Sequence, residues 1–278
     1  MPEEQQVDWQ EWMIELATDN AGPLAKELFS QALKKYFDKD QINLEVLFQN
    51  AINEICNRIE EIINEAFLNQ YLSDCDFLSD QFVIYSNSSS TTVLNKIQER
   101  SSELVNRFNG LGYKGIGGFF IAANMHLLSL RALDNKENTK YFCEKYIDMG
   151  KEFNEQLDSR AKSFDGVVKR YEGSWRVDTG DDENNRKDFE RYHVLTGEYP
   201  SYNVYYPTIF FAYHPNDGGN SIFFASPTAF SIDNERVELL QRQCDEKKET
   251  IFNNKVKPIL DMIEKNSQLL DIWKSWKF

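Results

Sequence analysis

Residues 115–130 read GIGGFFIAANMHLLSL, a run of sixteen positions without a formally charged side chain. As an α-helix this run rises about 24 Å, which is short of the roughly 30 Å hydrocarbon core of a bilayer. It also contains Asn124, His126 and Ser129, whose polar groups are costly in lipid. In water, a helix that is apolar nearly all round must be covered by other elements. The run therefore predicts the buried central helix of a bundle.

Apolar residues at spacings of three and four predict further helices around this one. We expect helices at about 43–71, 93–109, 116–133 and 139–171, after two shorter helical segments around 9–16 and 24–37. The stretch 72–92 ends in SNSSSTT and predicts a loop.

Beyond Tyr199 the composition becomes rich in aromatic and β-branched residues, with the turn NDGGN at 216–220. This pattern predicts a β-hairpin over 203–226. Helical periodicity returns over 233–276, where Pro258 either kinks one helix or separates two. The predicted fold class is mainly α: an antiparallel helical bundle around a central apolar helix, with a small β-hairpin before a C-terminal helical segment.

The predicted organisation has three parts. They are a helical bundle over 1–200, an aromatic hairpin or extended segment over 201–232, and C-terminal helices over 233–278 that pack on the same bundle.

The charge balance excludes some partners. The 278 residues include 31 Lys and Arg against 45 Asp and Glu, a formal net charge of −14. Without a basic block the chain has little with which to neutralise phosphates, so nucleic acid is not an expected partner.

The N-terminus is acidic and polar, so no Sec-type signal peptide is predicted and we expect a soluble protein. The four cysteines are far apart and predict buried free thiols.

No motif indicates catalysis or a cofactor. GLGYKGIGG at 110–118 contains G-x-G-x-x-G, but the residues before it have a helical period, so a turn between two helices explains these glycines. His126, His193 and His214 are the three histidines of the sequence, and none has the spacing of a two-ligand metal site. We expect no catalytic residue, metal or cofactor, and we interpret His126 as a hydrogen-bonded core residue.

The central segment resembles the N-terminal helical domain of the three-domain insecticidal δ-endotoxins, the Cry toxins. That family typically carries a block like AANLHLLLLRDA, and AANMHLLSLRAL stands here at 122–133. Eight of the twelve positions match in order, and the departures include Met125, Ser129 and Leu133 (the matches are Ala122, Ala123, Asn124, His126, Leu127, Leu128, Leu130 and Arg131).

A second, looser block supports the resemblance. Residues 199–207, YPSYNVYYP, are similar to the family's FP-x-YD-x-x-x-YP, and Trp175 stands where the family often has a tryptophan. The resemblance covers about residues 40 to 210. Only 71 residues follow Pro207 (278 − 207), where the family has two β-rich domains for receptor recognition.

The resemblance implies a pore-forming function in which a helical hairpin, here 93–109 with 116–133, enters a target membrane. The implied insertion residues are Gly115, Phe119, Phe120, Ala122, Ala123, Asn124, His126, Leu127, Leu128 and Leu130. The implied partners are the target membrane and either further copies of the chain or a second, receptor-binding component.

Two alternatives stay open. In one, the aromatic segment inserts as a β-tongue, with candidates Tyr205, Phe210, Phe211, Phe223 and Phe224. In the other, the chain is a non-lytic interaction or scaffold protein with a toxin-like fold, because fold does not fix function.

Overall fold

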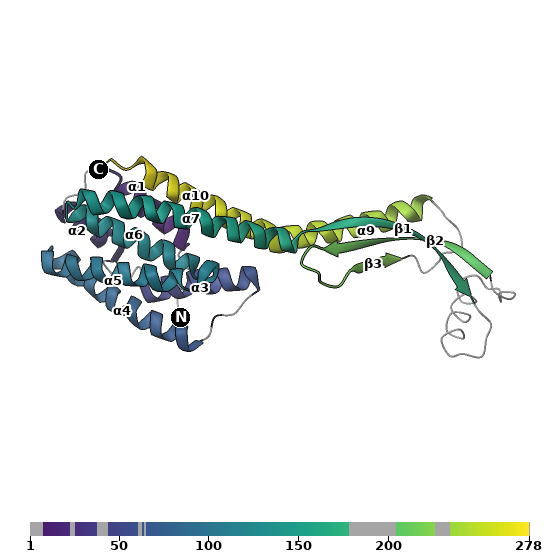
Figure 1. Cartoon of the computed structure of the whole chain (residues 1–278), viewed down its shortest axis with the longest axis horizontal. Helices are drawn as coiled ribbons and strands as arrows, with labels where there is room; N and C mark the ends of the chain where they lie inside the picture. Colours follow the sequence, from purple (N-terminus) through teal and green to yellow (C-terminus); the bar gives the residue numbers. More distant parts are fainter. Residues whose placement is uncertain are drawn as a thin grey trace. The chain divides into compact units, whose positions relative to one another are not determined.

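The computed structural model describes residues 8–22, 26–37, 44–60, 63, 65–177, 204–225 and 234–277 (Figure 1). The chain divides into two compact units. The first combines the residues up to Ala161 with those from Lys257 onward, and the second is Lys162–Val256.

The first unit is a bundle of helices, which confirms the predicted fold class. Its helices are α1 (Trp9–Asp19), α2 (Lys26–Phe37), α3 (Leu44–Ile59), α4 (Glu65–Ser88), α5 (Thr91–Asn109), α6 (Ile116–Ala132), most of α7 (Lys136–Phe164) and α10 (Lys257–Ser275). The short 3₁₀ turn η1 (Gly112–Gly115) joins α5 to α6. The helices predicted at 93–109 and 116–133 are therefore present as α5 and α6, and every residue of α6 is buried.

Two predictions for the region before α5 are wrong. The helix expected over 43–71 is two helices, because Glu60 has a positive φ of 57° and ends α3. The loop expected over 72–92 is helix to Ser88. The buried face of α4 repeats at spacings of four and three (Tyr71, Cys75, Leu78, Phe82 and Tyr85), which is a helical period that the neighbouring Ser and Asn residues obscure.

The helix predicted over 139–171 is also wrong in its last part. α7 ends at Phe164, and β1 (Gly166–Val177) follows. A Cβ at Gly166 would lie 2.4 Å from the carbonyl oxygen of His214, so the two strand backbones come together at a position that only glycine fits.

The second unit is a three-stranded antiparallel sheet with a helix on one face. The strands β1, β2 (Val204–Pro215) and β3 (Ile222–Ala225) are hydrogen-bonded in that order. The pairing of β2 with β3 confirms the predicted hairpin, whereas β1 is an addition that periodicity did not indicate. α9 (Asn234–Ile251) packs on the sheet through a core of Phe211, Tyr213, Leu240 and Cys244.

Pro258 lies just after a π-helical turn, and the described residues between α9 and α10 contain no break in helical structure. A π-helical turn, Phe252–Val256, follows α9, and α10 begins at Lys257. A proline within a helical run removes one backbone N–H donor and favours a local distortion, and the π-helical turn lies directly before Pro258.

The division into units differs from the predicted organisation. The first boundary lies after Ala161 instead of at residue 200. The segment 233–278 is divided as well, because α9 belongs with the sheet while α10 packs against α1 in the bundle.

Candidate functional site: the central helix and its contacts

The predicted insertion residues lie together on α6 and at its start. α6 packs against α1, α2, α3 and α5, and Figure 1 shows it inside the bundle. All ten predicted residues are buried: Gly115, Phe119, Phe120, Ala122, Ala123, Asn124, His126, Leu127, Leu128 and Leu130. The site is therefore a fully enclosed helix that is apolar on every face except for a few side chains.

α5 is amphipathic and forms a hairpin with α6. Its buried face carries Leu94, Ile97, Leu104, Val105 and Phe108, and its opposite face is polar. The two helices approach closely, because a Cβ at Gly118 of α6 would lie 2.5 Å from the Phe108 ring.

Asn124 ties α6 to both terminal helices of the described chain. Its side-chain amide nitrogen lies 3.4 Å from the carbonyl oxygen of Met13 in α1. Its Oδ1 accepts a hydrogen bond of 3.1 Å from the indole Nε1 of Trp273 in α10. Because an unpaired polar group is costly at such a buried position, these two contacts fix how α1 and α10 cover α6.

His126 joins α6 to α5 and α7. Its Nε2 accepts from the amide of Gln98 at 2.8 Å, and its Nδ1 lies 2.7 Å from the hydroxyl of Tyr146. Burial, with the nearby charge of Lys145, lowers the pKa of His126 to about 4. The imidazole is therefore neutral at pH 7, as expected for a hydrogen-bonded core residue.

Arg131, in the last turn of α6, is the charged residue of the helix. It donates to the carbonyl oxygens of Ala21 and Gly22 and lies over the Trp276 ring, 4.3 Å from its centroid. Burial lowers the pKa of Arg131. Its Nη1 and the Nε1 of Trp276 are buried without a hydrogen-bond partner. The C-terminal end of α6 is thus held to the segment after α1 and to the end of α10.

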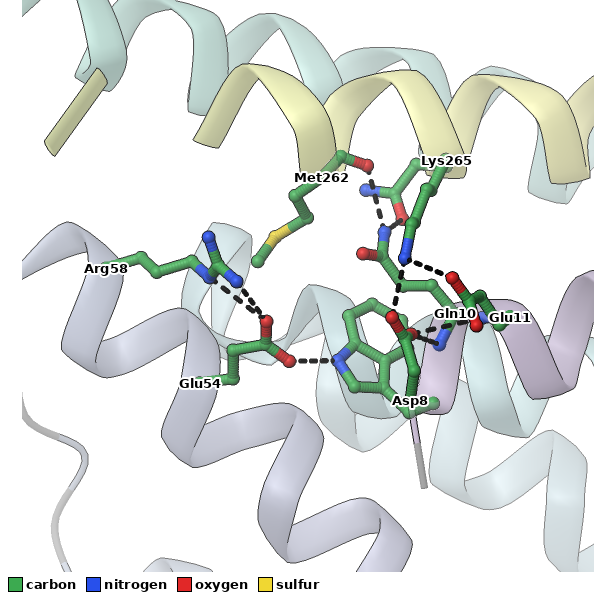
Figure 2. A network of polar contacts seen from close by, with 9 residues as sticks. Asp8, Gln10, Glu11, Glu54, Arg58, Met262 and Lys265 are labelled. Carbon is green, nitrogen blue, oxygen red and sulfur yellow. Dashed lines mark hydrogen bonds and ion pairs between the residues drawn. The ribbon is translucent and has the colours of Figure 1, made fainter. Parts of the chain in front are cut away.

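A buried polar chain fastens α10 to α1 and α7, and Figure 2 shows the part between α10 and α1. Gln10 donates to the carbonyl oxygen of Met262 at 2.9 Å and to Oδ1 of Asn266 at 2.8 Å. Asn266 donates in turn to Asn154 of α7 at 3.1 Å. Gln10 and Asn266 are both buried, so separating α10 from α1 would remove both acceptors of the Gln10 amide and the donor to Oδ1 of Asn266.

Ion pairs close the outer edge of this contact. Nζ of Lys265 lies 2.5 Å from Asp8 and 3.1 Å from Glu11, as Figure 2 shows. Partial burial opposes ionisation of Asp8, but the hydrogen bonds from Lys265 and from two backbone N–H groups lower its pKa on balance. Asp8 also caps the N-terminus of α1 by accepting from Gln10 and Glu11.

The β-tongue candidates do not share one environment. Phe211 is 3% exposed and lies in the core under α9, whereas Phe223 is 61% exposed on the opposite face of the sheet. The backbones of Tyr205, Phe210 and Phe224 belong to β2 and β3, and their side chains lie outside the described part of the structure.

Sequence reasoning missed a hydrogen-bonded row on this open face. The hydroxyl of Tyr171 in β1 lies 2.7 Å from Nε2 of His214 in β2, and the Nδ1 of His214 lies 2.7 Å from Oγ of Ser221. The register Tyr171↔Phe210 could not be foreseen while 139–171 was interpreted as helix. His193 lies outside the described residues.

Among the described residues, no helix combines the length and apolar character that crossing a membrane requires, and no cluster of side chains suits a metal ion. Comparisons with protein-family models, with curated proteins and with solved structures gave no match to this chain. The resemblance to the δ-endotoxin helical domain stays a prediction that rests on the residues quoted above.

Proposed function

We propose that this protein permeabilises membranes by inserting the α5–α6 hairpin. One observation carries the proposal: α6 is apolar apart from a few side chains, is enclosed by the bundle, and is joined by a short turn to an amphipathic partner. A helix that is apolar on all sides is suited both to a bundle interior and to lipid.

Both the bundle and a bilayer can cover the apolar surfaces of α5 and α6 and accommodate their polar groups. In the bundle, neighbouring helices cover α6. In a bilayer, lipid replaces them, while the polar face of α5 lines water and the Asn124 and His126 side chains face partner helices. α6 has 17 residues and rises about 25 Å, so the inserted pair is expected to thin a bilayer whose core measures roughly 30 Å.

The test is dye release from liposomes with the hairpin tied to the rest of the bundle. Two cysteines are introduced in α6 and α7 at positions with Cα atoms about 5.5–6 Å apart. The oxidised protein should fold but release no dye, and reduction should restore release. The four native thiols are buried in the folded protein, and burial raises the pKa of Cys143 to about 12.

A second disulfide, between α5 and α6, is the matched control. It lies within the hairpin, so the oxidised control should release dye at the rate of the parent. Full release from the oxidised α6–α7 form would show that α6 need not separate from α7 for permeabilisation. A folded parent that releases no dye across lipid compositions and pH values would instead favour the non-lytic interaction protein.

The open face of the sheet is a second candidate for membrane contact. Phe223, together with Val167 at 45% exposed, lies on the face that α9 does not cover. Phe223→Asp should reduce dye release if this face enters lipid. Leu239→Asp is the control, because Leu239 is 48% exposed on α9 of the same unit. Equal dye release from both variants would show that the open face of the sheet does not enter lipid.

A further inference from the structure

His126 lies where the hairpin is attached to the rest of the bundle. Its hydrogen bond to Gln98 joins α6 to α5, so this bond stays within the hairpin. Its contact with Tyr146 joins α6 to α7, so this contact must break when the hairpin leaves. We call His126, Gln98 and Tyr146 the imidazole latch.

The surroundings of the latch favour a neutral imidazole. From α7, the Phe142 ring lies 4.7 Å from the His126 ring between centroids, and the ammonium of Lys145 adds a positive charge. From α5, the group in contact is the uncharged amide of Gln98. Within the described residues, no carboxylate pairs with His126, and none of its contacts is to a titratable group of α1, α2, α3 or α10.

We propose that the imidazole latch is an acid switch: protonation of His126 releases the α5–α6 hairpin from α7. The consequence for membranes rests on the proposed function, whereas the release itself does not. A proton on His126 has no counter-charge in the closed bundle, while in the open state water solvates the imidazolium.

The direction and size of the pH effect follow from the difference between the pKa of His126 in the closed state and in the open state. The closed bundle holds His126 with its pKa lowered to about 4, and the open state has the ordinary value of 6.5. The neutral imidazole therefore favours closure above pH 6.5, and this advantage is lost as the pH falls toward 4. Between pH 7 and pH 5 the population of the open state should rise roughly 20-fold.

The experiment measures opening without lipid, by hydrogen exchange of the α6 amides at pH 7 and pH 5 after correction for intrinsic exchange rates. In the parent protein, protection of α6 should fall roughly 20-fold. His126→Phe, which keeps a ring between Phe142 and Tyr146 but cannot take up a proton, should show no such fall.

A surface variant keeps the test decisive even if His126→Phe folds poorly. Lys145 is exposed, and Lys145→Glu places a negative charge beside the latch. This change raises the pKa of His126 in the closed state and should reduce the response to acid by several-fold. Lys140→Glu makes the same charge change on an exposed position of α7 and should keep the parent response.

Equal protection of α6 at both pH values, or an unchanged response in Lys145→Glu, would overturn the switch. Dye release measured in parallel separates the two proposals. Acid opening without release at any pH would leave the switch standing and reject the pore.

Discussion

At the scale of single residues, the buried polar groups of α6 define how the bundle closes. Asn124 contacts Met13 and Trp273, which are 111 and 149 positions away in the sequence. Its polarity within an apolar run was visible in the sequence, but its partners were not, because nothing local in either segment encodes a contact at that separation.

We predict that Asn124→Ala lowers the free energy of unfolding by about 1–3 kcal/mol, because the indole N–H of Trp273 then lacks an acceptor in the core. Ser129→Ala is the matched control on the same helix. Its hydroxyl donates to the carbonyl oxygen of Met125 one turn earlier, so its removal should cost about 1 kcal/mol or less. Urea unfolding measures both.

A double-mutant cycle with Trp273→Phe isolates the contact. The two single changes should sum to more than the double change, by about 1 kcal/mol. Strict additivity would mean that the Asn124–Trp273 hydrogen bond contributes no coupling energy.

At the scale of elements, the sequence predicted α5 and α6 well and the regions around them poorly. α6 was predictable because residues 116–130, which are buried on every side, carry no formal charge, and this absence is visible in a single sequence. α4 was missed because its helical stripe, from Tyr71 to Tyr85, runs beside Ser and Asp residues that favour loops. β1 was missed because Val168 and Tyr171 fit a helical spacing, and only pairing with β2 decides between helix and strand.

For the candidate site, the sequence likewise indicated the residues of the helix but not their contacts. The ten residues of the insertion helix could be named from composition and from the resemblance. The polar contacts through Gln98, Tyr146 and Trp273 depend on how three other helices pack, so no spacing in the sequence could have given them.

At the scale of the whole molecule, net charge governs the approach to a membrane. The chain carries −14 at pH 7 and has a calculated isoelectric point near 4.8. An anionic bilayer therefore repels the protein at neutral pH, and salt screens that repulsion over about 10 Å at 0.1 M.

We predict that dye release from anionic vesicles at pH 7 becomes several-fold faster when NaCl is raised from about 20 mM to about 500 mM, because the Debye length then shortens. Release from zwitterionic vesicles is the control and should change by less than about two-fold. Faster release from anionic vesicles at low salt would instead reveal a local cationic surface that outweighs the net charge.

The contact between α1 and α10 also has a consequence for biosynthesis. α10 is translated only after the whole second unit, so a nascent chain holds α6 without Trp273 and without the cover that α10 provides. Closure of the first unit is therefore a late, long-range step of folding. During that interval the part of α6 that contacts α10, including Phe120 beside Trp273, is available to chaperones, and a cell that makes this protein must protect that apolar surface until α10 has been made.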